Sequence, residues 1–208
     1  MYKLVIFDFD GTLADSAGWF ARELRPLARR FGFRAVTETE LESLRGCDSR
    51  RIMARLGVPR WKLPFIARHM RRRMAEDAEM IPLFPGAKAL LRRLAGQGVM
   101  LGVVSSNSAG NVRRILGPEA AALVEHYACG ASVFGKAAKF RKVIRRAGVC
   151  SDQVLCIGDE TRDIEAAREA GVACGAVAWG YATRELLAKG GPTWLFDTWQ
   201  DVAERLAA

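Results

Sequence analysis

Two carboxylates stand directly after the first apolar run of the chain. Leu4–Phe7 is followed by Asp8 and Asp10, and Gly11 allows a tight turn after them. If the apolar run is a strand, side chains two residues apart point to the same side of it. Two adjacent carboxylates repel one another unless a cation or a shared proton relieves them, and hard oxygen ligands of this kind suit Mg²⁺. The pair therefore predicts a magnesium site with Asp8 and Asp10 as candidate ligands.

Short apolar runs alternate with amphipathic stretches through most of the chain. Runs rich in Val and Ile, with little polar alternation, are typical of strands buried on both faces of a parallel sheet. The expected strands are Leu4–Phe7, Val99–Val104, Val154–Ile157 and Val172–Trp179. The expected helices between them are Ala87–Ala95, Ala138–Ala147 and Asp163–Ala170. The expected C-terminal caps are Gly96, Gly148 and Gly171. This order predicts βαβ units and an α/β fold, with a Rossmann-like three-layer core around a parallel sheet.

Residues 15–81 break this alternation because they contain no convincing strand. The helical stretches expected there are Trp19–Phe31, Glu38–Leu44, Ser49–Leu56 and Pro64–Met80. Prolines then cluster within residues 81–86, where we expect a hinge back into the sheet. We therefore predict an α/β core domain formed by residues 1–14 and 82–208, with an inserted α-helical cap domain at residues 15–81.

The tract Asp8-Phe9-Asp10-Gly11-Thr12 resembles the first signature of the haloacid dehalogenase-like hydrolase superfamily. The resemblance implies that Asp8 attacks phosphorus to form an aspartyl-phosphate, while Asp10 protonates the leaving group and then activates water. Dehalogenases of this superfamily lack the second acid, whereas phosphatases and mutases keep it. The implied reaction is therefore phosphoryl transfer. The side chain of Asp8 and the backbone carbonyl of Asp10 are implied ligands of Mg²⁺.

A hydroxyl ends a later apolar strand, as in the second signature of the family. Ser105 follows Leu101–Val104, and Ser106 and Asn107 come next. A serine after a strand is by itself more often a cap or turn residue. A hydroxyl and the backbone N–H groups of the following turn can nevertheless hold phosphoryl oxygens. The resemblance implies that Ser105 is catalytic and binds phosphate, with Ser106 and Asn107 as further substrate contacts.

Two lysines compete for the third signature, a lysine that neutralises the phosphoryl group and the attacking carboxylate. Lys136 and Lys139 stand three residues apart, without the prolines that relatives usually show after this lysine. We favour Lys136, in both catalysis and substrate binding, because it lies in the loop just before the helical pattern. We expect Lys139 inside the helix with its ammonium group in solvent.

The fourth signature lies at Ile157–Asp163, again after an apolar strand. Asp159 and Asp163 are four residues apart, so one helical turn brings them to the same side. The resemblance implies that Asp159 binds Mg²⁺ directly and that Asp163 supports it through water or the lysine. An acidic helix start that is favoured by the helix dipole is a compatible interpretation. Glu160 is a further candidate beside the metal.

The substrate hypothesis depends on resemblance. The helical insertion resembles the caps of phosphoglycolate phosphatase and β-phosphoglucomutase, which close over small substrates. Leu44–Arg50 resembles the substrate loop of sugar-phosphate relatives, although it has one extra residue. Arg45 and Arg50 are therefore candidates to receive a second anionic group, and ordinary surface arginines are an equally good interpretation. The run at residues 177–182 resembles phosphoglycolate phosphatase-type members.

The leading hypothesis is Mg²⁺-dependent hydrolysis of a small, phosphoglycolate-like phosphate monoester. The nearest alternative is a phosphomutase or phosphotransferase, in which the aspartyl-phosphate passes its phosphoryl group to a sugar. The alternative from another class is a non-catalytic protein that binds anions or nucleic acid and has kept the fold. The net charge of +9 motivates that third hypothesis, and the complete set of acids argues against it.

Composition and charge indicate the class of protein, its partners and its location. Half of the residues are hydrophobic and 26% are charged, which indicates a globular chain and excludes a disordered one. The arginines are spread along helical segments without a basic stripe interleaved with aromatic residues, so we expect a solvated surface and no nucleic-acid partner. The five cysteines show no paired spacing and are expected to be free thiols. No apolar run approaches the roughly 20 residues of a membrane span. We expect a cytoplasmic enzyme that acts on a small phosphorylated metabolite, and the oligomeric state stays open.

Overall fold

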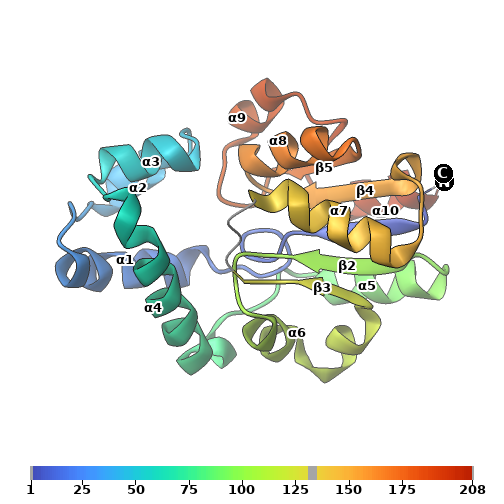
Figure 1. Cartoon of the computed structure of the whole chain (residues 1–208), viewed down its shortest axis with the longest axis horizontal. Helices are drawn as coiled ribbons and strands as arrows, with labels where there is room; N and C mark the ends of the chain where they lie inside the picture. The colour runs from blue at the N-terminus through green and yellow to red at the C-terminus, as the bar shows by residue number, and fades with distance from the viewer. Residues whose placement is uncertain (1, 131–134, 208) are drawn as a thin grey trace.

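A parallel sheet of six strands forms the centre of the computed structural model, which describes residues 2–130 and 135–207 (Figure 1). The strand order is β3-β2-β1-β4-β5-β6. The strands are β1 (Leu4–Phe7), β2 (Met100–Val104), β3 (His126–Ala128), β4 (Val154–Gly158), β5 (Ala173–Val177) and β6 (Trp194–Phe196). In the register of the sheet, Phe7 lies beside Val103 of β2 and Ile157 of β4. The residues that follow these three strands therefore meet at one edge of the sheet, as the sequence predicts for a ligand site in an α/β fold.

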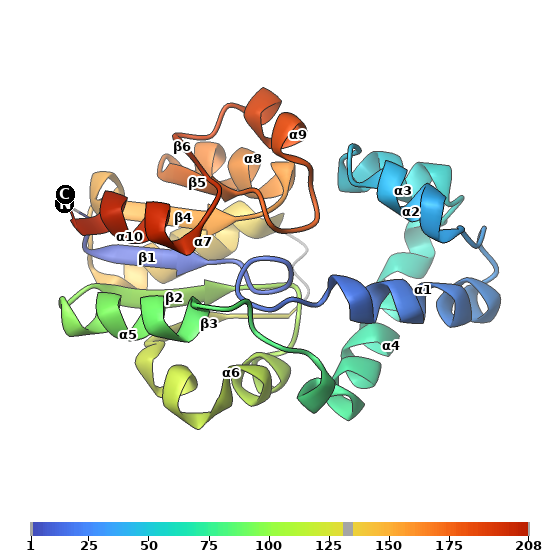
Figure 2. The same ribbon diagram turned by 180° about the vertical axis from the view of Figure 1, so that it is seen from behind.

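Helices cover both faces of the sheet and complete the predicted three layers. One face carries α5 (Ala87–Gly96), α6 (Ala109–Leu123) and α10 (Trp199–Ala207), and the other carries α7 (Gly135–Ala147), α8 (Thr161–Ala170) and α9 (Arg184–Gly190). Figure 1 shows α7 and α8 in front of the sheet. Figure 2, the view from behind, shows α5 and α10 in front of the opposite face. The α/β fold with a parallel sheet is confirmed.

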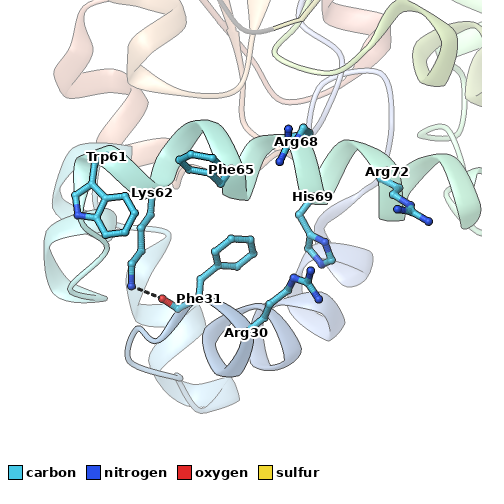
Figure 3. A pocket seen from close by; sticks show the side chains of 8 residues that line it. All are labelled: Arg30, Phe31, Trp61, Lys62, Phe65, Arg68, His69 and Arg72. Carbon is cyan, nitrogen blue, oxygen red and sulfur yellow. Dashed lines mark hydrogen bonds between the residues drawn. The ribbon is translucent and has the colours of Figure 1, made fainter.

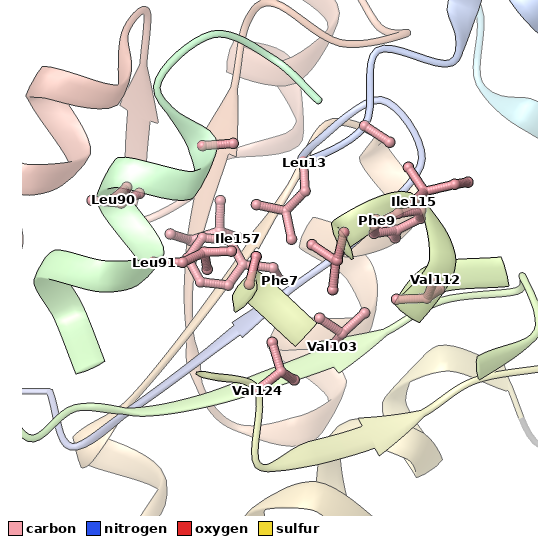
Figure 4. Close-up of a cluster of buried hydrophobic side chains, with 14 of the residues drawn as sticks. Phe7, Phe9, Leu13, Leu90, Leu91, Val103, Val112, Ile115, Val124 and Ile157 are labelled. Carbon is pink, nitrogen blue, oxygen red and sulfur yellow. The ribbon is translucent and has the colours of Figure 1, made fainter. Parts of the chain in front are cut away.

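Strand β1 is apolar on both sides because it lies between two hydrophobic layers. Val5 and Phe7 point into the cluster that α5, α6 and α10 cover, whereas Leu4 and Ile6 point into the cluster under α7, α8 and α9. All four side chains are fully buried. Figure 4 shows the first cluster, with Phe7 packed among residues of α5, β2 and β4. This packing holds β1 rigidly, which in turn fixes the loop that carries Asp8.

The region between β1 and β2 is helical, as the sequence predicts. It contains α1 (Ala17–Phe31), α2 (Glu38–Leu44), α3 (Ser49–Arg55), the short 3-10 helix η1 (Arg60–Lys62), α4 (Leu63–Glu76) and the 3-10 helix η2 (Ala78–Met80). Figures 1 and 2 show α1 to α4 gathered on one side of the sheet. We call α1 to η2 the cap.

The two chain segments that join the cap to the sheet run side by side. Asp15 N–H donates to the carbonyl of Pro82 over 2.9 Å, and Phe84 N–H donates to the carbonyl of Leu13 over 2.9 Å. These bonds join the entry and the exit of the cap at the positions where we expect the domains to meet. The domain boundaries at residues 14/15 and 81/82 stay a prediction.

Several elements differ from the sequence prediction. Helices α6, α9 and α10 and strands β3 and β6 were not predicted, and the 3-10 helix η3 (Ser151–Gln153) precedes β4. The expected C-terminal cap at Gly96 is wrong, because α5 includes that residue and the left-handed conformation falls on Gly98, at φ 77°. The other two expected caps are left-handed, with φ of 67° at Gly148 and 71° at Gly171.

Among the described residues, no helix combines the length and the apolar character that crossing a membrane requires. The five cysteines are free, as expected.

Candidate active site

Three buried carboxylates meet at the edge of the sheet where β1 and β4 end. Asp8 follows β1, Asp159 follows β4, and Asp163 lies in the first turn of α8. Their side chains each offer a carboxylate oxygen within 4.8 Å of those of the other two. No more than 4% of any of these residues is exposed. We call Asp8, Asp159 and Asp163 the carboxylate cluster.

Lys136 connects two members of the carboxylate cluster. Its Nζ lies 2.8 Å from Asp8 Oδ2 and 2.5 Å from Asp163 Oδ1. Burial by itself lowers the pKa of Lys136, but the charges of Asp163 and Asp8 outweigh burial and raise its pKa above the ordinary value. The lysine is therefore a fixed positive charge between two acids. It belongs to the first turn of α7, which begins at Gly135, so the expected loop position was wrong.

Lys139 has a different environment from the one that the sequence predicts. It lies inside α7, as expected, but its ammonium group is not left to solvent. Its Nζ donates to the carbonyl of Ser105 over 2.6 Å and also to the carbonyl of Gly130. Lys139 thus ties the turn after β2 to the turn after β3, while Lys136 alone of the two contacts the carboxylate cluster.

Asp159 is held by two donors that sequence reasoning missed. Thr12 Oγ1 donates to Asp159 Oδ1 over 2.6 Å, and the backbone N–H of Tyr181 donates to Oδ2 over 2.8 Å. Gly11 and Gly180 approach this carboxylate so closely that a Cβ on either would overlap Asp159. Thr12 stands in the tract that the sequence singles out, but nothing in its spacing shows that it reaches a residue 147 positions away.

The electrostatics of the carboxylate cluster favour a bound cation. Burial first, and then the charges of Asp8 and Asp163, raise the pKa of Asp159 well above the ordinary value. The ammonium group of Lys136 cannot balance three buried carboxylates alone. Glu160 adds an acid beside the cluster and pairs with the guanidinium of Arg162. Three buried carboxylates are hard oxygen ligands, so the residues fit a divalent cation such as Mg²⁺.

Asp10 lies near the carboxylate cluster but outside it, and its side chain faces a different set of groups. Its Oδ2 is 3.5 Å from Ser105 Oγ and 3.4 Å from Asn107 Nδ2. Its Oδ1 is buried and has no hydrogen-bond partner among the described residues. Burial, and then the charge of Asp8, raise the pKa of Asp10 to about 7. This carboxyl group can therefore carry a proton near neutral pH, as a proton donor must.

The turn after β2 brings Ser105 and Asn107 to the same place and leaves Ser106 facing outward. Ser105 is 1% exposed, and its Oγ accepts from the backbone N–H of Asn107 over 3.0 Å. Asn107 is also buried, whereas Ser106 is exposed. Ser105 and Asn107 therefore lie beside Asp10, whereas the backbone carbonyl of Ser106 accepts from Arg71 over 3.4 Å.

Arg45, at the end of α2, contacts the loop that holds Asp159. Its Nε donates to the carbonyl of Tyr181 over 3.3 Å, and its Nη2 donates to that of Gly180 over 3.1 Å. The backbone N–H of Thr183 donates to the carbonyl of Arg45 over 3.1 Å. The cap thus binds one side of the loop at residues 180–183, and Asp159 binds the other. Arg50 is exposed on α3, and the role of both arginines in substrate binding stays a prediction.

The cap also reaches this loop through α1. Ser16, which precedes α1, has its Oγ 2.6 Å from the hydroxyl of Tyr181. The ring of Phe20 packs edge-on against the ring of Tyr181, with 5.8 Å between the centroids. The side chain of Tyr181 therefore contacts Ser16 and Phe20, and its backbone N–H donates to Asp159.

Known proteins resemble this chain in sequence and in overall fold. A family model described as haloacid dehalogenase-like hydrolase matches residues 5–177. The chain is 33% identical over 203 residues to a phosphoglycolate phosphatase of Synechococcus elongatus, in an alignment that covers 97% of this chain and 96% of that protein. It is 30% identical to a phosphoglycolate phosphatase of Xanthomonas campestris, over 86% of this chain and 84% of the relative. The crystal structure of a predicted phosphatase from Clostridium acetobutylicum superposes with a TM-score of 0.84 at 20% identity, over 100% of this chain and 99% of that one.

Proposed function

The chain belongs to the haloacid dehalogenase-like hydrolases, and we propose that it is a Mg²⁺-dependent phosphatase that hydrolyses a small carboxylated phosphate monoester, 2-phosphoglycolate or a close analogue. The observation that carries the proposal is the buried carboxylate cluster with Lys136 at the end of β1. The carboxyl oxygen of Asp10 that has no partner among the described residues supports the same chemistry.

In the first half of the proposed reaction, Asp8 is the nucleophile. A carboxylate oxygen of Asp8 bonds to phosphorus while the bond from phosphorus to the substrate's ester oxygen breaks. That oxygen leaves with the electron pair and takes the proton of Asp10, so an alcohol departs and a phosphoryl group stays on Asp8. The backbone N–H of Phe9 and the ammonium of Lys136 hold the two oxygens of Asp8, over 2.8 Å each, and so orient the attack.

In the second half, Asp10 acts as a base. Its carboxylate takes a proton from water, and the water oxygen bonds to phosphorus while the bond to Asp8 breaks. Inorganic phosphate leaves, and both acids return to their starting states. Ser105 and Asn107 lie beside Asp10, and we expect them to hold phosphoryl oxygens.

Mg²⁺ completes this proposal as the counter-ion of the site. Asp8, Asp159 and Asp163 would hold it, and when bound it would offset the charge that builds up as a carboxylate approaches a phosphate dianion. Thr12 and Tyr181 orient Asp159, which is the kind of outer support that metal-binding carboxylates require.

We also infer that Arg45 is a positioning residue for this site. Its guanidinium holds the carbonyls of Gly180 and Tyr181, and a neighbouring backbone group, the N–H of Tyr181, holds Asp159. A contact made by the cap is thereby linked to a proposed metal ligand in the core. Correct seating of the cap would then favour the geometry that binds Mg²⁺.

The relatives and the chemistry of the cap support the proposed substrate class. The two relatives described above are both phosphoglycolate phosphatases. A carboxylate on the substrate needs a positive group near the phosphoryl site. Arg71 of α4 supplies one, because its Nη1 lies 3.4 Å from the carbonyl of Ser106.

The test is phosphate release from a panel of monoesters in the presence of Mg²⁺ and, separately, of EDTA. We expect Mg²⁺-dependent release with kcat/KM for 2-phosphoglycolate at least about tenfold above that for monoesters of similar size that lack a carboxylate. Absence of phosphate release from every member of the panel would contradict the proposal. Isomerisation of a sugar phosphate without net phosphate release would identify a mutase instead.

A further inference from the structure

A groove lies between the end of α1 and the segment that contains η1 and α4, away from the carboxylate cluster. Its cavity volume is about 560 Å³. The residues that line it are Arg30, Phe31, Trp61, Lys62, Phe65, Arg68, His69 and Arg72 (Figure 3). We call it the cap groove. It corrects the expectation that basic and aromatic side chains are not interleaved in this protein. Rings and cations alternate along residues 61–72, and Arg30 and Phe31 of α1 complete the groove.

The spacing of residues on α4 explains why this groove is separate from the catalytic site. Phe65, Arg68, His69 and Arg72 are spaced three, one and three residues apart, so they form one stripe along the helix. In Figure 3, His69 of this stripe points toward α1. Met70 and Met74 on another face of α4 are buried, and Arg71 contacts the turn after β2. One side of α4 thus packs toward the core, whereas the stripe lines the cap groove.

Positive charge in the cap groove has little compensation from its own walls. Four of the eight lining side chains are Arg or Lys, and none is acidic. Lys62 Nζ donates to the carbonyl of Phe31 at the end of α1 over 2.6 Å, and Arg72 pairs with Glu76 over 3.3 Å. Arg30 and Arg68 face aromatic rings, at 5.9 Å from the centroid of Phe31 and 5.8 Å from that of Phe65. Both arginines are exposed and available to an anion.

The aromatic side chains of the cap groove are unusually open to solvent. Trp61 is 68% exposed and Phe65 is 50% exposed. In Figure 3 the ring of Phe31 points into the space between the two helices. Exposed rings next to guanidinium groups form a surface on which a flat ring can stack while a phosphate is bound beside it. Burial, followed by the charge of Arg30, lowers the pKa of His69, so at neutral pH its imidazole adds another uncharged ring.

We propose that the cap groove is a binding site for a nucleoside phosphate, whose base stacks on Trp61 and Phe65 while Arg30 and Arg68 bind its phosphates. The volume matches one small ligand and is too small for the several nucleotides that a single-stranded nucleic-acid site usually spans. A second copy of the chain is disfavoured, because a two-fold contact through this face would place the four cations of one copy against those of the other. The site is independent of the proposed phosphatase chemistry.

The experiment is calorimetric titration of the full chain with ATP and with AMP in EDTA, which withholds the metal required for turnover. We expect one nucleotide to bind per chain, and adenosine and inorganic phosphate to bind at least about tenfold more weakly, because each supplies half of the contacts. Phe65→Ala and Arg68→Ala should each weaken ATP binding about tenfold. Arg92→Ala is the matched control, because Arg92 is an exposed helical arginine on α5 at 60% side-chain exposure. That variant should bind ATP as the unaltered chain does.

Four outcomes would overturn the proposal. They are the absence of nucleotide binding, an equal loss in the Arg68 and Arg92 variants, much tighter binding of a single-stranded oligonucleotide than of ATP, and a groove variant that changes the sedimentation of the protein instead of its nucleotide affinity. Phosphatase turnover of Arg68→Ala should equal that of the unaltered chain, because Arg68 lies in the cap groove and not at the carboxylate cluster. Equal turnover also shows that the variant is folded.

Discussion

The carboxylate cluster and the cap groove both concentrate charge, but they do so under opposite physical conditions. Asp8, Asp159 and Asp163 are buried at the ends of packed strands, and Lys136 and Thr12 fix their oxygens. The arginines of the cap groove stand on helix surfaces in contact with water. Buried charges are costly unless each is paired, whereas exposed charges cost little. Substitutions in the cluster should therefore have large effects, and substitutions in the groove should change ligand binding and little else.

The largest expected effect is that of Asp8→Asn. Removal of the attacking carboxylate should lower kcat for phosphate release on the order of 10⁴-fold or more, because the covalent step is lost. Asp15→Asn is the control, since Asp15 is exposed and lies outside the carboxylate cluster. If the Asp8→Asn protein is folded and releases phosphate within about tenfold of the unaltered chain, Asp8 is not the nucleophile.

The second prediction separates the two lysines of α7. Lys136→Ala should reduce kcat about 10²- to 10³-fold, because the carboxylates of Asp8 and Asp163 lose their counter-ion. Lys139→Ala should cost far less activity, because its ammonium binds backbone carbonyls and not the cluster. Steady-state kinetics of both variants, with thermal unfolding to verify their folding, is the measurement. A larger loss in the Lys139 variant would reverse the assignment.

The third prediction concerns the support of Asp159. Thr12→Val keeps the shape of the side chain and removes the donor that lies 2.6 Å from Asp159 Oδ1. Mg²⁺ should bind about tenfold more weakly, as judged both by calorimetry and by the Mg²⁺ dependence of turnover. Thr12→Ser keeps the hydroxyl and should restore most of the affinity. If the Thr12→Val and Thr12→Ser proteins bind Mg²⁺ equally well, the hydroxyl has no such role.

The smallest of these effects should come from the cap. Arg45→Met removes two hydrogen bonds to the loop at residues 180–183 and should weaken Mg²⁺ binding about threefold to tenfold, with a smaller change in substrate KM. Arg55→Met is the control, because Arg55 is an exposed arginine of the same cap. A large rise in KM with unchanged Mg²⁺ affinity would favour substrate binding by Arg45 over positioning.

The difference between the two regions also explains which features could be predicted from sequence. Buried strands such as β1 are uninterrupted apolar runs, and Asp8 and Asp159 follow directly from where those runs end. β3 and β6 escape the same reasoning because each has three residues, among them His126 and Trp194, whose side chains are half-buried at the edges of the sheet. Strands of three residues carry too little pattern to be recognised.

Contacts between distant segments were the features that sequence could not provide. The hydrogen bonds of Thr12 and Tyr181 to Asp159 depend on how the sheet and the loops close, and spacing along the chain does not reveal them. Lys139 reaches the turn after β2 for the same reason. The cap groove brings Arg30 and Phe31 against residues 61–72, which lie 30 residues further along the chain, and this contact between separate segments exists only in the fold.

If Asp8 is the nucleophile, its carboxylate becomes phosphorylated during turnover. The direct measurement is a single-turnover reaction with 2-phosphoglycolate labelled in its phosphoryl group, quenched in acid at early times and followed by mapping of the label in peptides. Transient label is expected on the peptide that contains Asp8, at the carboxylate of Asp8 itself, before labelled phosphate accumulates. Steady phosphate release with no label on the protein at any time, or label on another residue, would contradict it.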